Sequence, residues 1–218
     1  MNVDEVKGSL EELRAAGVAR VPAVIASNGV AHGWNPPAYA ELLGVDYRAL
    51  EKLSPKELAE RLDLILEFTE RLMAELPSRA LQYKAPQRDR TMRDLGYHVF
   101  RLSLAFVDAM DLGNFPEHWL NSNAPPEMVE GADVARYGAL VRGRIGGWFE
   151  GAAPTDFDRS VEVYYGPQSA HDLLERTTWH AGQHLRQLYA VLPEAGVTPT
   201  RPLPAGIFEG LPLPASLW

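Results

Sequence analysis

The chain has 218 residues, 46% apolar and 23% charged, a composition that supports a sizeable core and excludes a wholly disordered protein. Its 21 basic and 29 acidic residues give a net charge of −8, which argues against binding to nucleic acid or to an anionic membrane surface. Cysteine is absent, so disulfides, thiolate metal ligands and cysteine nucleophiles are excluded.

The start of the chain is charged and contains no apolar segment suited to a signal peptide or a membrane span, so we expect a cytoplasmic protein. Residues 1–46 predict a small αββα appendage, because two short apolar runs flank an Asn-Gly pair that is typical of a tight hairpin turn. The expected elements are a helix over 3–16, strands over 20–26 and 30–33 with a turn at Asn28-Gly29, and a helix over 37–43.

Residues 50–192 predict a bundle of four amphipathic helices. The first begins at Ser54, which is followed by Pro55 and by Glu57 in the pattern of a capping box. The third contains four glycines, each of which weakens a helix by about 1 kcal/mol relative to alanine but lets a neighbour approach closely. The expected spans are 54–76, 91–110, 132–150 and 169–192.

The connections between these helices are longer than a simple up-and-down bundle needs, so we expect long crossovers between helices that are not neighbours. The last of them contains an alternating stretch at 159–165 that predicts a short extended segment. Residues 193–218 hold six prolines together with several large apolar side chains. We expect this tail to pack on the bundle, because it is too apolar for a free linker.

Two histidines, His180 and His184, stand four residues apart on the fourth predicted helix, which puts both imidazoles on one face. His98 occupies an inward position on the second helix, flanked by apolar residues at helical spacing. Three imidazoles in a bundle repel one another when protonated, whereas one metal ion satisfies all three nitrogens. We therefore expect a metal site with vacant positions, suited to zinc, nickel, iron or copper. The alternative is a chance His-x-x-x-His pair beside a core histidine bonded to a hydroxyl.

The segments 91–98 (TMRDLGYH) and 173–188 (LLERTTWHAGQHLRQL) resemble the DinB/YfiT superfamily. The resemblance covers about residues 50–192 and implies a mainly α fold, a four-helix bundle with long crossovers, assembled as a homodimer. It implies that one divalent ion is held by three ligands: His98, His180 and His184. Zinc is the first expectation, with nickel or iron as alternatives. Gln187, one turn beyond the last ligand, is expected either to contact that histidine or pack beside it, or to lie on the helix surface.

Characterised members of this superfamily include transferases and isomerases that use a small thiol cofactor, such as mycothiol or bacillithiol, whose sulfur the metal activates. A related iron-binding domain carries the pattern HxxxHxE, but the position two after His184 is Arg186 here, which does not support that iron chemistry.

The stretch around Val21 and Pro22 resembles the C-terminal half of a glutaredoxin or thioredoxin. In that fold a residue before a cis proline offers its backbone to a thiol substrate, so the resemblance implies a cis Val21-Pro22 bond and a weak thiol-binding role for both residues. The half that carries the CxxC motif is missing, so redox activity is not implied. The alternative is a vestigial module that covers an apolar face of the bundle.

Several other residues are assigned from their helical angle. Trp179 lies off the apolar stripe and is expected to pack against the tail or a partner subunit. Arg186 lies off the histidine face and is expected to pair with a surface glutamate. One of three residues is a candidate to line the pocket, with a structural role as the alternative for each: Tyr164, Tyr165 or Arg144. The remaining histidines are expected to face solvent: His32, His118 and His171.

The function predicted from these features is a metal-dependent enzyme that activates an external low-molecular-weight thiol for S-transfer or isomerisation of a small-molecule substrate. Because the chain lacks cysteine, the thiol has to be a bound cosubstrate. The alternatives are a metal-dependent hydrolase that activates water, and a non-catalytic metal-binding stress or sensor protein.

Overall fold

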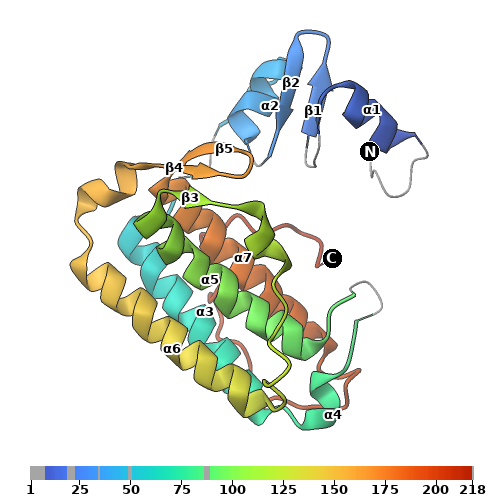
Figure 1. The fold of residues 1–218 in the computed structure, drawn as a ribbon, viewed down its shortest axis with the longest axis vertical. Coiled ribbons are helices and arrows are strands. Elements are labelled where there is room, and N and C mark those ends of the chain that lie inside the picture. Colours follow the sequence, from blue (N-terminus) through green and yellow to red (C-terminus); the bar gives the residue numbers. More distant parts are fainter. Residues whose placement is uncertain (1–7, 19–22, 34, 49–50, 86–88, 218) are drawn as a thin grey trace. The chain divides into compact units, whose positions relative to one another are not determined.

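The computed structural model describes residues 8–18, 23–33, 35–48, 51–85 and 89–217. The chain divides into two compact units, Met1–Glu51 and Lys52–Trp218 (Figure 1). Each unit has its own secondary structure and is described in turn.

The N-terminal unit contains α1 (Ser9–Ala15), β1 (Ala23–Ala26), β2 (Gly29–His32) and α2 (Pro36–Leu43), which is the predicted αββα order. The strands form an antiparallel hairpin in which Ala26 lies opposite Gly29, so its two-residue turn falls one position earlier than predicted. The side chain of Asn35 caps α2 by accepting a hydrogen bond from the amide of Ala38, and Gly44 ends the helix with a φ of 61°.

The C-terminal unit is built on four long helices, α3 (Pro55–Glu75), α5 (Met92–Leu112), α6 (Gly131–Gly151) and α7 (Ala170–Val191), with the short α4 (Ser78–Leu81) after α3. Ser54 begins α3 with the predicted capping box: its Oγ accepts from the Glu57 amide at 3.3 Å, and Glu57 Oε2 accepts from the Ser54 amide at 2.8 Å. Thr91 and Ser169 cap α5 and α7 in the same way, each accepting from the amide three residues on.

The order of the helices around the bundle explains the long connections. Helices α3 and α5 each pack against both α6 and α7, so α3 and α5 lie on one diagonal and α6 and α7 on the other (Figure 1). Chain neighbours α3 and α5 are therefore not spatial neighbours, nor are α6 and α7. Helices α5 and α6 are adjacent but run in the same direction, so their connection returns along about 30 Å of helix.

A small sheet covers one end of the bundle (Figure 1). It consists of β3 (Asn114–Phe115), β4 (Ser160–Val163) and β5 (Gly166–Ser169), with β4 in the middle, parallel to β3 and antiparallel to β5. Strand β4 lies in the predicted extended stretch, and its alternation buries Val161 and Val163. Two 3₁₀ helices, η1 (Glu117–Asn121) and η2 (Pro154–Asp158), complete the connections.

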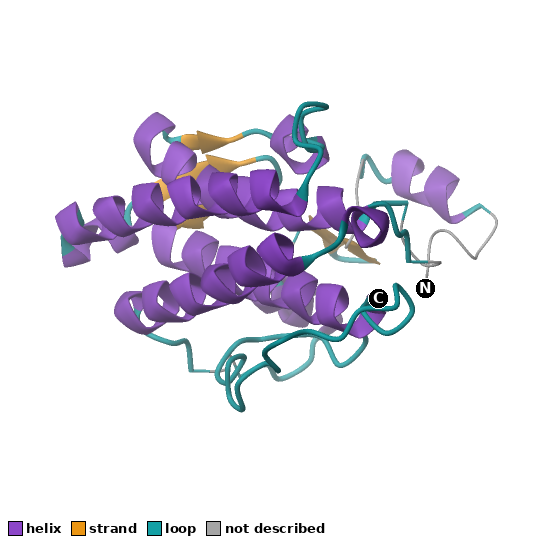
Figure 2. Ribbon diagram, turned by 90° about the horizontal axis from the view of Figure 1, so that it is seen from below, coloured by secondary structure: helices purple, strands orange, loops and turns teal. Residues whose placement is uncertain are grey.

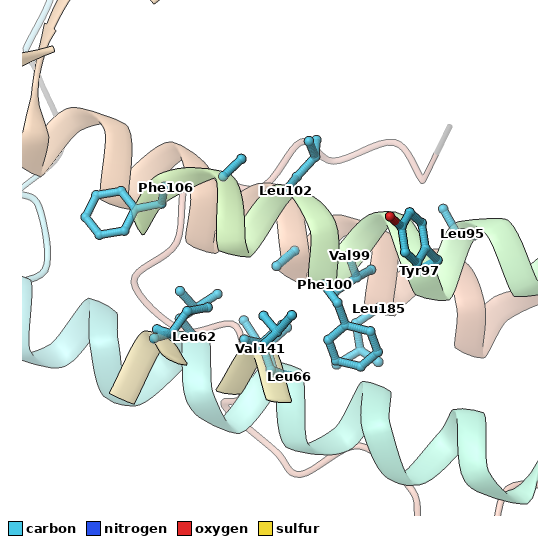
Figure 3. Close-up of a cluster of buried hydrophobic side chains, with 14 of the residues drawn as sticks. Leu62, Leu66, Leu95, Tyr97, Val99, Phe100, Leu102, Phe106, Val141 and Leu185 are labelled. Carbon is cyan, nitrogen blue, oxygen red and sulfur yellow. The ribbon is translucent and has the colours of Figure 1, made fainter. Parts of the chain in front are cut away.

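The core lies between the four long helices, where apolar side chains from each of them meet (Figure 3). Phe100 of α5 is fully buried there and packs against Gly138 of α6. A Cβ atom at Gly138 would lie 2.4 Å from the Phe100 ring. This glycine therefore permits the close approach of α5 to α6 that the glycines of the third predicted helix indicated. None of the described helices combines the length and apolarity required to cross a membrane.

The tail after α7 contains no helix or strand within its described part, residues 193–217, and runs as a loop (Figure 2). It nevertheless packs on the bundle, because Ile207 is 2% exposed in the core and Phe208 lies against Gly182 of α7. Arg61 of α3 donates to the Gly206 carbonyl at 2.6 Å, which ties the middle of the tail to the helices.

Candidate metal centre

The structure brings three of the predicted site residues together between α5 and α7. His98 projects from α5 toward His180 and His184 of α7, and the ring centroids lie 5.3 and 5.1 Å from His98. One nitrogen of each ring falls within 4.8 Å of the other two. His98 is 4% exposed, His184 is 8% exposed and His180 is half-buried, so the cluster sits at the inner wall of the bundle.

The hydrogen bonds of His184 define which of its nitrogens faces the cluster. Its Nδ1 lies 2.7 Å from Gln187 Oε1, an acceptor, so Nδ1 carries the proton and Nε2 has its lone pair free of hydrogen. That Nε2 lies 3.0 Å from His180 Nε2. Two imidazole nitrogens therefore converge on one point, while the third ring approaches from the other helix.

The pKa of His180 is well below the ordinary histidine value. Burial is the largest cause, because it disfavours the charged imidazolium, and the neighbouring rings of His184 and His98 add to it. The positive charges of Arg176 and Arg90 lower it further. His180 is therefore neutral near pH 7, which is the state in which an imidazole binds a metal ion.

Gln187 lies directly behind His184. It is fully buried, and while its Oε1 accepts from His184, its Nε2 donates to the Leu217 carbonyl at 2.7 Å. The structure thus gives Gln187 a contact with a histidine of the cluster and does not place it on the helix surface.

The end of the tail is held beside the histidines by α7. Gln183 Nε2 donates to the Leu217 carbonyl at 2.7 Å, and Arg186 donates to the Pro214 carbonyl and to Gln183 Oε1, both at 3.0 Å. The expectation that Arg186 pairs with a surface glutamate was wrong, because its angle on the helix points it to the tail. Sequence reasoning did not find these contacts, since the tail has no periodicity that predicts its path.

The histidines open onto a pocket of about 410 Å³. Besides the three rings, its lining includes four large side chains: Arg90, Tyr164, Arg176 and Trp179. Tyr164 is thus one of the three candidates predicted to line the pocket, whereas Arg144 pairs with Asp111. Trp179 also faces the pocket. No aspartate or glutamate is part of the described lining, whose formally charged side chains are the two arginines Arg90 and Arg176.

Arg176 is a site residue that the sequence analysis missed. Its Nη1 donates to the Tyr165 hydroxyl at 2.8 Å and its Nη2 to the Tyr164 hydroxyl at 2.7 Å, and the guanidinium lies over both rings. Burial raises the pKa of Tyr165, although the charge of Arg176 opposes that shift. The signal was available, because Arg176 stands four residues before His180 and therefore shares its helix face.

The remaining histidines lie apart from the cluster. His32 and His118 are exposed as predicted, but His171 is half-buried and its Nε2 lies 2.8 Å from the Leu53 carbonyl. The expectation that His171 faces solvent was wrong, because the segment before α3 covers it. Val21 and Pro22 lie outside the described residues, so their thiol-binding role and the cis bond stay predictions.

The donor set fits a divalent metal ion. Two imidazole nitrogens bound to a tetrahedral zinc at about 2.0 to 2.1 Å stand about 3.3 Å apart, close to the 3.0 Å between His180 and His184. Within the described residues, the group of potential ligands consists of the three histidines alone. The three could therefore hold an ion while leaving its remaining positions directed toward the pocket.

No model of a known protein family matches the sequence, and no curated protein matches it significantly. Among solved structures, the fold is similar to the crystal structure of a DinB-like protein from Bacillus subtilis, YjoA, with a TM-score of 0.54 at 15% sequence identity. The match covers 67% of this chain and 96% of that one. The chain has the DinB-like fold. The predicted fold class is thereby confirmed. The resemblance of the N-terminal unit to glutaredoxin stays a prediction.

Proposed function

We propose that this DinB-like protein is a metal-dependent enzyme that activates an external low-molecular-weight thiol for S-transfer or isomerisation of a small-molecule substrate. The observation that carries the proposal is the convergence of His98, His180 and His184 at the wall of a pocket of about 410 Å³. Zinc is the first candidate for the ion, and nickel or iron are the alternatives, since imidazole nitrogen suits all three.

The geometry of the cluster favours catalysis over a structural role. Structural zinc sites are closed by four protein ligands, whereas catalytic ones keep a position for water or substrate. The described residues supply three histidines and no fourth carboxylate or imidazole to the group, and the rings face a pocket. This arrangement supports an enzyme over the alternative of a non-catalytic sensor.

The chemistry that the site supplies depends on what occupies the open position. When bound, a divalent ion lowers the pKa of a coordinated thiol or water and so provides a nucleophile near neutral pH. Gln187 holds the His184 ring in the tautomer that presents Nε2, and Arg176 and Trp179 flank the approach. We place a thiol before water because the superfamily pattern implies thiol chemistry, and because the stretch around Val21 and Pro22 resembles part of a glutaredoxin.

Metal analysis of the purified protein tests the first step. We expect about one divalent ion per chain in the wild type and little in His184→Ala, because that variant loses one of three ligands. His118→Ala is the matched control, since this histidine is exposed and lies outside the cluster. Equal metal content in wild type and His184→Ala would contradict the site.

Thermal unfolding with added thiols tests the second step. A thiol at 100 times its Kd raises the free energy of unfolding by about 2.7 kcal/mol, which raises Tm by several degrees. We expect such a rise with one of glutathione, mycothiol, bacillithiol or ergothioneine, and its loss when a chelator removes the ion. If no thiol gives a metal-dependent rise, the thiol part of the proposal is wrong, and a metal-dependent hydrolase becomes the better-supported function.

The homodimer and the cytoplasmic location stay predictions. Analytical ultracentrifugation tests the homodimer.

A further inference from the structure

The partly buried guanidinium of Arg176 has no carboxylate partner within the part of the chain that the structure describes. Three partly buried arginines of the bundle pair with acidic side chains: Arg93 with Asp94, Arg101 with Asp108, and Arg142 with Asp63 and Glu70. Two others, Arg61 and Arg186, donate to carbonyls of the tail. Arg176 forms no ion pair with any described residue and is held instead by two phenol hydroxyls. Withdrawing a charge from water without a counter-charge costs free energy. Arg176 differs from these five arginines because it lines the pocket beside the histidines, where an anionic ligand can supply the counter-charge.

The hydrogen-bonding capacity of Arg176 leaves room for such a ligand. A guanidinium carries five N–H groups, and the two tyrosine hydroxyls use only two of them. Stacking against Tyr164 and Tyr165, at 5.3 and 4.7 Å from their ring centroids, keeps the plane of the guanidinium in one orientation. The arginine is thus already ordered before a ligand arrives, which reduces the entropy lost on binding.

The position of Arg176 connects it to the histidine cluster. It stands one helical turn, about 6 Å of rise, before His180, and both side chains line the same pocket. Arg176 and His180 also line a small recess of about 30 Å³, whose other walls are mostly apolar: Leu102, Phe115, Leu120 and Leu173. An apolar recess beside a cation suits the alkyl part of an organic anion better than a free inorganic ion.

From these observations we propose that Arg176 is the anchor for a carboxylate group of the substrate or of the thiol cosubstrate, which makes the ligand of this site an organic anion. A planar carboxylate accepts two parallel N–H bonds from a guanidinium, and no acidic side chain of the described residues lines the pocket to compete with it. The assignment rests on the proposed function for the neighbouring metal ion, but the anion site itself is testable without that ion.

The test compares an acid with its neutral amide on cobalt(II)-loaded protein, where sulfur coordination gives a charge-transfer absorption. The probes are 4-mercaptobutyrate and 4-mercaptobutyramide, which carry the same thiol on the same chain. We expect wild type to bind the acid about 10- to 100-fold more tightly than the amide, and Arg176→Gln to lose that preference while retaining cobalt. Arg176→Lys keeps the positive charge but loses the paired N–H groups of the guanidinium, so we expect an intermediate preference for the acid over the amide. The control is Arg136→Gln, at an exposed arginine on α6, which should keep the wild-type ratio.

Three results would overturn the proposal. One is an equal affinity of wild type for acid and amide, and the second is a preference that survives in Arg176→Gln. The third is tighter binding of 3-mercaptopropanesulfonate, whose oxyanion is tetrahedral, than of the carboxylate probe. If no thiol produces the absorption, the proposed function fails, and titration of chelator-treated protein with butyrate and butyramide, followed by NMR, still decides the anion site. Butyrate binding that depends on Arg176 supports the site there, and its absence refutes it.

Discussion

Gln187→Leu separates the orientation of a metal ligand from the packing of the tail. The substitution keeps the volume of a fully buried side chain but removes two hydrogen bonds of 2.7 Å each, one to His184 Nδ1 and one to the Leu217 carbonyl. The Leu217 carbonyl keeps a partner, because Gln183 also donates to it. The His184 N–H loses the acceptor that orients the ring. The variant should therefore disturb the orientation of His184 more than the packing of the tail.

The expected magnitudes follow from these contacts. Losing two hydrogen bonds and leaving a buried N–H without an acceptor costs about 2 to 3 kcal/mol of unfolding free energy in the metal-free protein. For a unit of this size that lowers Tm by about 5 to 10 °C. Releasing the ring of His184 weakens metal binding by about 10- to 100-fold, as for other residues that orient a ligating histidine.

Competition with a chromophoric chelator measures the metal affinity, and thermal unfolding in excess chelator measures the stability. The matched control is Gln183→Leu, one turn earlier on α7, which also loses its bond to the Leu217 carbonyl but touches no histidine by hydrogen bond. We expect the control to lower Tm and to bind metal as wild type does. The reasoning is refuted if Gln187→Leu binds metal with wild-type affinity, or if both variants weaken metal binding equally.

Two further predictions concern packing and pH. Gly138→Ala places a Cβ 2.4 Å from the Phe100 ring and should lower the unfolding free energy by about 1 to 3 kcal/mol, whereas Gly143→Ala on the same helix, with open space around it, should raise it by up to about 1 kcal/mol. Urea unfolding of both variants checks the signs, and a stabilised Gly138→Ala would contradict the close approach. Because the pKa of His180 is lowered in the folded state, this histidine is protonated below about pH 6.5 in the unfolded chain but stays neutral in the folded chain. The free energy of unfolding of the metal-free protein should therefore fall by up to about 1.4 kcal/mol per pH unit below pH 6.5. The variant His180→Gln should show a weaker dependence on pH, and an unchanged slope would contradict the prediction.

Local patterns predicted the helices and the histidine cluster well. The capping pattern at Ser54 and the cap residues Thr91 and Ser169 predicted where three of the four long helices begin, because a cap is a contact within one turn. The spacing of His180 and His184 predicted a shared face for the same reason. Their meeting with His98 needed the further inference that α5 and α7 pack together, which the apolar stripes indicated.

The residues that sequence analysis misplaced depend on contacts between distant segments. Arg186 was assigned to the surface, yet it holds the Pro214 carbonyl, 28 residues further along the chain. His171 was assigned to solvent, yet it meets the Leu53 carbonyl, 118 residues earlier. The helical angle gives only the direction in which a side chain leaves its own helix. It cannot indicate which loop covers a polar face of that helix.

The sequence alone determined the helical class, the three histidines and the absence of any sulfur nucleophile, because composition and helical spacing are properties of the chain itself. Only the tertiary structure decided that the histidines open onto a pocket, that Gln187 lies behind His184, and that Arg176 bonds two tyrosines and pairs with no carboxylate of the described residues. The physical reason is that periodicity specifies the direction of a side chain within its own element. What it meets there depends on the crossovers and the tail, whose paths are set by packing between residues far apart in the chain.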